Sequence, residues 1–596
     1  MSKHAFSTAT VISRTTGKPH HSHHNWRTRI AAAFGGGLLA ATSLGLPATH
    51  AAQLVTLSLG AAERSIEVSD LVTFANTDDI PRGLQWYVDR FEPDQVDEFR
   101  SLLSTEFEID PLSTSRFLNG PLGSILLERL LVLFRTNDPD TTLKALRSAI
   151  VLAAFDREEG FSIINVIQKW PLREVELNFN VALDAIEDAE QLFVETEKVS
   201  AYLRQEAIIE TANTDLPANL PNLRDPGIFT WTIESVQLVN AERIGRNLIS
   251  ADIYMPEGLD GEAPLVVISH GLGSSRTTFG YLAEHLASHG IAVAAIEHPA
   301  TNSVSVEQFF AGFLTPAGTD IFLQRPRDIT LLLDELEAMT APGARWEGQM
   351  NTSNVGVVGQ SLGGYTALAI GGADLDINHL RQECETTLQS LPFNLSIELQ
   401  CQLLDAEEPL NDRYSLRDDR VAAVMAINPV SSAIFGPAGM GELEIPITIV
   451  ASRNDFFAPA IPEQVFPYIW TGSTEGKYLV YVENATHFSF LGNGESGASA
   501  SLLPSEMLGP EPEGAQPVLQ ALGTAFMQRY LDETDLDRTS AVADIYSNAY
   551  LGRIEHPSFR FFLSNSLSMD DINLAIAAPL SQDLALARHP FSRPLL

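Results

Sequence analysis

The sequence predicts an α/β protein in which a mostly parallel, doubly wound sheet follows an all-helical N-terminal region. Short apolar runs alternate with helical patterns after residue 228, and a Pro- and Asn-rich stretch at 216–227 precedes them. Before that stretch, apolar residues recur at spacings of three and four. Alternation of strand and helix is typical of right-handed βαβ units, and wholly apolar strands suit a sheet that is buried on both faces.

The first 51 residues have the composition of a secretory signal. They contain no acidic residue, and an apolar run from Ile30 to Ala48 precedes small residues at 49 and 51. The basic residues are Lys3, Arg14, Lys18, Arg27 and Arg29. The order basic, apolar, small predicts export to the periplasm or the extracellular space, with cleavage near residue 52. A retained membrane anchor is the alternative interpretation.

Composition excludes several classes of protein. The chain has 596 residues, of which 45% are hydrophobic and 19% charged, a balance typical of globular domains. Its 76 acidic residues against 38 basic ones give a formal net charge of −38, which argues against nucleic acid or an anionic lipid surface as a partner. Two cysteines are too few for a disulfide scaffold or a four-cysteine zinc site.

The pattern divides the rest of the chain into four parts. Residues 53–215 are expected to form the helical domain, a cap, docking or interaction module that an envelope or protein partner would bind. The Pro- and Asn-rich stretch is a linker. The catalytic domain is expected at 228–535 and a C-terminal extension at 536–596.

Within the catalytic domain, the sequence predicts an opening antiparallel pair of strands and then a parallel series. The pair is predicted at 229–239 and 247–256, and the series at 264–271, 291–299, 354–361, 421–429, 447–455 and 477–484. Helices are predicted at 276–289, 327–340, 363–373, 461–470 and 516–531. Ligands of such sheets bind at the carboxyl ends of the strands, so these ends are the expected place for chemistry.

A nucleophile motif follows one of these strands. Ser361 lies between Gly359 and Gly363, in a G-x-S-x-G sequence between an apolar strand and a helix. Small neighbours permit the sharp strand-to-helix turn that exposes a serine hydroxyl over a helix N-terminus. The motif alone is weak evidence, since Ser361 would also fit as a small residue in a tight turn. The predicted strand before the motif and the predicted helix after it are what support a nucleophile.

An acid and a base follow two later strands. Asp455 comes just after the strand at 447, and His487 after the strand at 477. The order Ser, Asp, His suits a nucleophile, an orienting acid and a base on this kind of sheet. The strand ending at 429 has no carboxylate after it until Glu442, which favours Asp455 as the acid. Taken singly, Asp455 would also fit a helix N-cap and His487 a polar loop residue.

Two backbone amides are expected to stabilise a developing oxyanion. One belongs to Leu362, immediately after the nucleophile. The other is assigned to Leu272, in the loop His270-Gly271-Leu272-Gly273 after the strand at 264. Glycines let backbone amides approach a substrate oxygen closely, although the same loop would also fit a simple turn into the next helix.

The segments SHGLGSSR, GQSLGGY, NDFFAP and NATHF together resemble the α/β-hydrolases, nearest to the platelet-activating-factor acetylhydrolase and dienelactone-hydrolase-like branch. The resemblance covers about 228–535, and the region before it resembles a domain of cyanobacterial hydrolases. It implies ester hydrolysis through an acyl-enzyme on the residues named above. The acetylhydrolases place their acid after the preceding strand, and dienelactone hydrolases use a cysteine nucleophile, so this chain departs from both patterns.

A long insertion at 374–420 is expected to cover the strand ends as a lid. It contains both cysteines, Cys384 and Cys401, and an oxidising compartment would close them into a disulfide. Two buried thiols are the alternative. The segment 300–326 and the phenylalanines beside Asp455 and His487 predict an apolar acyl pocket.

These observations predict an exported serine hydrolase of carboxylic esters, either lipid or small acyl esters. A peptidase, thioesterase, transacylase or polyester hydrolase, and a catalytically silent binding protein on the same fold, are the alternatives. No cofactor or metal is implied, because the sequence has no dinucleotide, phosphate-loop or zinc-protease motif. A histidine run at 20–24 lies in the part expected to be removed. The oligomeric state is not predicted.

Overall fold

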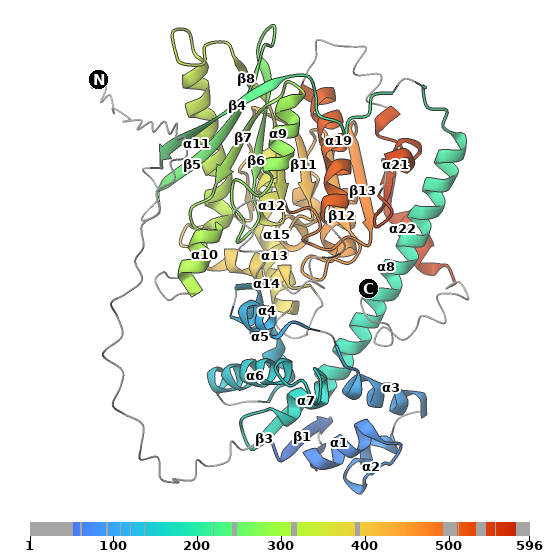
Figure 1. The fold of residues 1–596 in the computed structure, drawn as a ribbon. Coiled ribbons are helices and arrows are strands. Elements are labelled where there is room, and N and C mark those ends of the chain that lie inside the picture. Colours follow the sequence, from blue (N-terminus) through green and yellow to red (C-terminus); the bar gives the residue numbers. More distant parts are fainter. Residues whose placement is uncertain are drawn as a thin grey trace, which may run out of the picture.

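A computed structural model gives the fold of the chain (Figure 1). It describes residues 52–59, 62–90, 93–107, 109–119, 121–135, 138–218, 220–240, 247–310, 319–387, 394–492, 509, 512–531, 544–554 and 556–579. The expected signal segment lies outside these residues.

A nine-stranded sheet forms the centre of the catalytic domain, in the order β14-β13-β12-β11-β8-β6-β7-β5-β4. Its strands are β4 (Thr230–Val239), β5 (Leu248–Glu257), β6 (Ala263–Ser269), β7 (Ala292–Glu297), β8 (Met350–Gln360), β11 (Val421–Ile427), β12 (Ile447–Ser452), β13 (Lys477–Glu483) and β14 (Arg560–Ser564). All pairs from β7 through β6, β8, β11 and β12 to β13 are parallel, whereas β4, β5 and β14 pair antiparallel. The predicted large and mostly parallel sheet is therefore confirmed.

Helices cover both faces of this sheet because its central strands are apolar on both sides. In β6, Val267 belongs to one buried cluster, while Val266 and Ile268 belong to the cluster on the opposite face. Helices α9 (Gly280–Ser288) and α19 (Pro512–Leu531) pack on the second face, and α11 (Ile321–Thr340) and α12 (Leu362–Gly371) on the first. Parallel strands therefore end together at one edge of a two-sided core.

The N-terminal region is not all-helical, which corrects the sequence prediction. It contains a three-stranded sheet in the order β2-β1-β3, built from β1 (Leu54–Leu59), β2 (Ala62–Glu67) and β3 (Glu174–Asn178). Its helices are α1 (Val68–Asn76), α2 (Arg82–Val88), α3 (Pro93–Ser104), α4 (Pro111–Leu118), α5 (Pro121–Leu130), α6 (Pro139–Ala154) and α7 (Ile163–Gln168). The parallel partner of β1 lies more than a hundred residues away, so no local pattern reveals the pairing.

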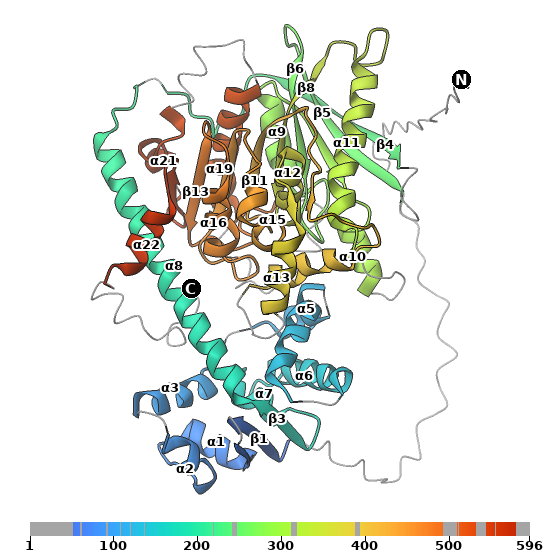
Figure 2. The same ribbon diagram turned by 180° about the vertical axis from the view of Figure 1, so that it is seen from behind.

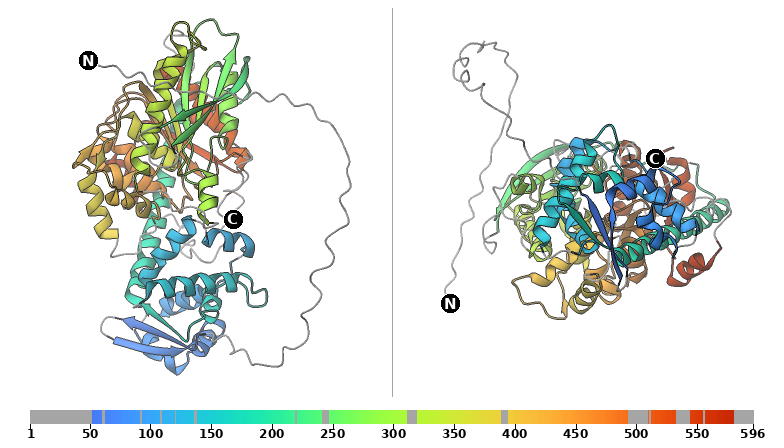
Figure 3. Two further views of the ribbon diagram at one scale, coloured as in Figure 1. Left: turned by 90° about the vertical axis from the view of Figure 1, so that its left-hand side faces the viewer. Right: turned by 90° about the horizontal axis from the view of Figure 1, so that it is seen from below.

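One long helix connects the two parts of the molecule. Helix α8 (Phe179–Asn213) has 35 residues, about 50 Å at 1.5 Å per residue, and runs from the N-terminal sheet along the edge of the catalytic domain (Figures 1 and 2). It packs against β14, α21 (Asn548–Ile554) and α22 (Met569–Ala577) of the C-terminal extension. Figure 3 shows the N-terminal region extending beyond one end of the catalytic domain.

The insertion after α12 forms a small substructure at the carboxyl edge of the sheet. It contains β9 (Leu375–Asp376), α13 (Ile377–Thr387), α14 (Ser396–Cys401) and β10 (Arg413–Tyr414), and the two short strands pair antiparallel. Both helices pack on α15 (Ser432–Met440), and α5 of the N-terminal region lies beside them in both views (Figures 1 and 2). No helix among the described residues is both long and apolar enough to cross a membrane.

Candidate active site

The turn between β8 and α12 holds Ser361 in a strained conformation. Its backbone has φ 57° and ψ −120°, a region that non-glycine residues rarely adopt. A Cβ at Gly359 would lie 2.0 Å from the carbonyl oxygen of Gly363, and a Cβ at Gly363 would lie 2.0 Å from that of Ser269. Both positions therefore require glycine, and this close packing is what allows the turn. The Ser361 amide is fixed by the Ile427 carbonyl at 2.9 Å.

Asp455 follows β12 and accepts hydrogen bonds at both carboxylate oxygens. Its Oδ1 accepts from the amides of Phe457 at 3.0 Å and Ala458 at 2.7 Å. Its Oδ2 accepts from Gln464 Nε2 at 3.0 Å and lies 2.7 Å from His487 Nδ1. The side chain is buried, so these contacts replace water and fix the direction in which the carboxylate points.

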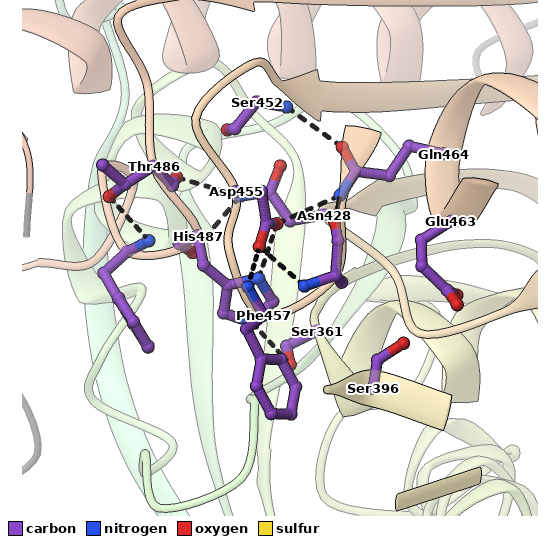
Figure 4. A network of polar contacts seen from close by, with 12 residues as sticks. Ser361, Ser396, Asn428, Ser452, Asp455, Phe457, Glu463, Gln464, Thr486 and His487 are labelled. Atoms are coloured by element: carbon purple, nitrogen blue, oxygen red, sulfur yellow. Dashed lines mark hydrogen bonds and ion pairs between the residues drawn. The ribbon is translucent and has the colours of Figure 1, made fainter. Parts of the chain in front are cut away.

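His487 follows β13 and joins Asp455 to Ser361 (Figure 4). With the Nδ1 proton directed at Asp455, the free acceptor is Nε2, which lies 2.9 Å from Ser361 Oγ. The main-chain carbonyl of His487 accepts from Gln360 Nε2 at 3.0 Å and from Asn428 Nδ2 at 3.2 Å. The structure thus brings together the three residues that the sequence proposed, from three different strand ends.

Asn428 and Gln464 contribute to this site and were missed by the sequence analysis. Asn428 directly follows β11 and has φ 44°. The resembled acetylhydrolases place their acid at this strand end, and here an amide holds the loop with His487 instead. Gln464 lies in the π-helical turn η3 (Ile461–Val465), and its Oε1 accepts from the Ser452 amide at 3.0 Å. A positive-φ asparagine was not visible in the sequence, and nothing in the spacing marked Gln464.

The loop after β6 lies against the nucleophile turn. A Cβ on Gly271 would lie 2.5 Å from Gln360 Oε1 and 3.4 Å from Ser361 Cβ, so the loop backbone touches this turn directly. The Gly273 amide donates to the Thr301 carbonyl at 2.8 Å, which fixes the residue after Leu272. Leu362 opens α12, and the first amides of a helix have no intrahelical acceptor. The structure therefore places the two proposed oxyanion donors on segments that flank Ser361.

His270, at the start of this loop, is held in its neutral form. Burial, and then the nearby Arg325 guanidinium, lower the pKa of His270 to about 3. Its Nδ1 lies 2.7 Å from the Gly271 carbonyl, and its Nε2 accepts from the His298 amide at 3.0 Å. A neutral ring with both nitrogens occupied is a structural support for the loop and not a second base.

Aromatic rings enclose the histidine. The rings of Phe457 and Phe488 both lie 5.0 Å from that of His487, and both residues are buried. The insertion reaches this wall directly, since the Ser396 amide of α14 donates to the Phe457 carbonyl at 2.9 Å. In the segment 300–326, residues 311–318 lie outside the described part of the chain, and Phe322 packs on Tyr365 in the core.

The fully buried carboxylate of Glu463 connects the insertion to the start of α15, beside the triad. Glu463 Oε1 accepts from Asn394 Nδ2 at 2.6 Å and Gln400 Nε2 at 3.0 Å, and its Oε2 accepts from the amides of Ser431 and Ser432 at the start of α15. A disulfide joins Cys384 of α13 to Cys401 of α14. The described part of the chain contains no group of three or more His, Cys, Asp or Glu side chains placed to hold a metal.

Two family models match segments of the chain. Residues 51–178 match a family described as an α/β-hydrolase of unknown function, and residues 245–316 match platelet-activating factor acetylhydrolase, isoform II. The second match covers β5, β6, β7 and the loop with Leu272 but ends before Ser361. A comparison with curated proteins found no match. Together with the mostly parallel sheet, the two matches are consistent with the α/β-hydrolase superfamily.

Proposed function

We propose that this protein is a serine hydrolase that cleaves carboxylic esters through an acyl-enzyme. The observation that carries the proposal is the unbroken hydrogen-bonded chain from Asp455 through His487 to Ser361, with contacts of 2.7 and 2.9 Å. Each member follows a different strand, and the serine occupies a strained turn at a helix start. Acylation by a serine needs this arrangement of nucleophile, base and orienting acid.

In the proposed reaction, His487 Nε2 removes the hydroxyl proton of Ser361 as Oγ attacks the acyl carbon. The Leu272 and Leu362 amides stabilise the oxyanion of the tetrahedral intermediate, and each such donor is worth about 10²–10³ in rate. His487 then protonates the leaving alcohol. A water molecule, activated by the same histidine, releases the acid and restores Ser361. Asp455 holds the imidazole in the required tautomer throughout.

The apolar enclosure of the base favours an uncharged acyl group. Phe457 and Phe488 surround His487, and the net charge of −38 disfavours anionic substrates at long range. The match to platelet-activating factor acetylhydrolase supports lipid or short acyl esters as the substrate class. Peptides, thioesters, other acyl acceptors and polyesters are the alternatives that a substrate panel separates.

The decisive assay uses p-nitrophenyl esters of graded acyl length with the parent protein, Ser361→Ala and His487→Ala. Both variants should lose turnover, and Ser361→Ala should also lose labelling by a fluorophosphonate. Ser473→Ala removes a buried hydroxyl elsewhere in the catalytic domain and should retain activity. A parent that is neither active nor labelled would mark a silent hydrolase fold, and a Ser361→Ala protein with more than a few per cent activity would mean a different nucleophile.

We further propose that the protein is exported. The basic, apolar and small order of residues 1–51 supports this, as does the Cys384–Cys401 disulfide, since disulfides persist in oxidising compartments. Mass spectrometry of the native protein should find an N-terminus near residue 52. Thiol titration of the denatured, non-reduced protein should find no free thiol. An intact Met1 or two free thiols would contradict export.

A further inference from the structure

A second buried polar network lies behind the nucleophile turn and is not used by the proposed chemistry. It is centred on Arg325 of α11, which is 1% exposed, and it includes Ser269, His298 and Asp328. Ser269 Oγ lies 3.0 Å from His298 Nε2, and His298 Nδ1 lies 3.2 Å from Asp328 Oδ2. This repeats the order of contacts of a catalytic triad, but none of the three residues is more than 1% exposed, so no substrate reaches it.

Arg325 contacts three segments that surround the proposed oxyanion hole. Its Nη2 donates to the His270 carbonyl, two residues before Leu272, and to Ser269 Oγ at 3.2 Å. Its Nη1 donates to Thr301 Oγ1 at 2.6 Å. The main-chain carbonyl of that same threonine accepts from the Gly273 amide at 2.8 Å. The guanidinium therefore holds the loop with Leu272 on both sides of that residue.

A further contact of Arg325 fixes the segment with the other donor. Its Nε donates to Thr366 Oγ1 at 3.1 Å, and Thr366 Oγ1 in turn donates to the Leu362 carbonyl at 2.8 Å. Thr366 lies one turn after Leu362 on α12 and is fully buried. One planar group thus connects both segments that carry the expected oxyanion donors, with a geometry that a lysine does not reproduce.

We propose that Arg325 is a positioning residue that sets the Leu272 and Leu362 amides at a fixed separation around the oxyanion. The expected effect of Arg325 on kcat rests on the proposed function. Its expected effect on the order of the two segments does not depend on that function. The same network connects the guanidinium to the buried Asp328 carboxylate through Ser269 and His298. Removing a guanidinium from water is unfavourable unless hydrogen-bond partners compensate, so the contacts of Arg325 are expected to hold a defined geometry.

The test compares Arg325→Met and Arg325→Lys with Arg327→Met as the matched control. Arg327 lies two residues along the same helix but pairs with Glu408 at the surface. Arg325→Met should lower kcat on a short p-nitrophenyl ester by about 10²-fold with KM within about threefold, since one misplaced donor is worth that much. Arg325→Lys should give an intermediate loss, and Arg327→Met should leave both constants within about twofold.

Two readouts separate positioning from a general loss of stability. Inhibition by a trifluoromethyl ketone, whose adduct with Ser361 carries an oxyanion, should weaken in proportion to the fall in kcat. Hydrogen exchange should accelerate in peptides covering 268–274 and 361–366 but not in β12 or β13. If Arg325→Met does not fold, Thr301→Val and Thr366→Val each remove one acceptor with little change in shape, and each should lower kcat about three- to tenfold.

The outcomes distinguish this inference from the proposed function. A parent protein that hydrolyses no ester and binds no fluorophosphonate would refute the function, and hydrogen exchange would still decide whether Arg325 orders the loop. Unchanged exchange at 268–274 in Arg325→Met would overturn the inference. So would a fall in kcat with unchanged inhibition by the ketone, because the oxyanion donors would then be in place.

Discussion

The catalytic sheet and the N-terminal sheet differ in how their strands are covered. In β7, β11 and β12 almost every residue is buried, because helices lie on both faces. In β3 only Val175 is buried, and in β2 Glu63, Arg64 and Ser65 face solvent beside the buried Ile66. A two-sided core resists local opening, whereas a sheet with one covered face depends on what packs against that face.

Helix α8 belongs to both parts, so the N-terminal region and the catalytic domain share buried contacts. Its residues Val199, Leu203 and Ala207 lie in the same buried cluster as the catalytic strands, and Ser200 Oγ lies 2.7 Å from Tyr481 OH of β13. Its Glu197 pairs with Arg453, two residues before Asp455. We infer that the N-terminal region supports the acid loop, the segment from Arg453 to Asp455 after β12, through α8, while the proposed chemistry takes place in the catalytic domain.

The largest expected effect tests where the chemistry lies. Asp455→Asn should lower kcat by about 10⁴-fold, because the amide favours the wrong imidazole tautomer while the fold is kept. Thermal unfolding should change little, and exchange in β1 to β3 should not change. Glu408→Gln, a carboxylate of the insertion that pairs with Arg327, is the matched control and should stay active. An active Asp455→Asn protein and an inactive Glu408→Gln protein would mean that the acid lies in the insertion.

The second prediction tests whether α8 is part of the catalytic core. Leu203→Ala removes a side chain that is 3% exposed and should cost about 2–4 kcal/mol of unfolding free energy, measured by urea unfolding with activity as the probe. Ile208→Ala on the same helix, at 64% exposure, should change it by no more than about 0.5 kcal/mol. Equal small effects would mean that the catalytic sheet is stable without α8, and the inferred support would be wrong.

These two regions also show how much the sequence could predict. The strands of the catalytic sheet are short apolar runs between helical patterns, and Ser361, Asp455 and His487 each follow one directly, so chain order alone brings them to one edge. The N-terminal sheet has no such signal, because β2 is rich in charged residues and β1 pairs with a strand at the far end of the region. An interpretation based on local spacing therefore assigned only helices there.

Within the candidate site, the sequence predicted some residues and missed others. The three triad residues that follow strands could be found, while the residues that reach the site from helices could not. Arg325 and Gln464 act through side chains whose direction depends on helix packing and on a π-helical turn, and neither feature leaves a pattern in the sequence. Asn428 also follows a strand, but its type suggested no role, and its contacts with the Thr486 and His487 carbonyls appear only in the structure.

The third prediction concerns the linker that joins the two regions. Burial, and then the neighbouring His289, lower the pKa of His285 on α9 to about 4, and its Nε2 lies 2.8 Å from the Leu223 carbonyl. The folded state keeps this ring neutral while the unfolded chain takes up a proton below about pH 6.5, so stability falls as the pH drops from 6.5 toward 4. The loss should reach about 1–2 kcal/mol at pH 5.

Urea unfolding at pH 7, 6 and 5 measures this slope. In His285→Gln the amide can still donate to the Leu223 carbonyl but does not titrate, so its stability should vary less with pH than that of the parent. Asn222→Gln, a linker substitution at an exposed position, should keep the parent's slope. If the parent and His285→Gln lose stability in parallel, the linker contact does not carry the pH dependence.

The smallest expected effect is at the contact between α5 and α14, where the N-terminal region meets the insertion. Arg129 Nη1 lies 3.7 Å from Glu398 Oε2, and the Glu398 side chain is 31% exposed. A long ion pair with one solvated partner should contribute about 0.2–1 kcal/mol, less at high salt. A double-mutant cycle of Arg129→Met and Glu398→Gln should therefore give a coupling in that range and kcat changes below about threefold. A coupling above about 2 kcal/mol, or a selective loss of activity on long acyl esters, would contradict the division argued above. The N-terminal region would then control access to Ser361 through the insertion, in addition to supporting the acid loop through α8.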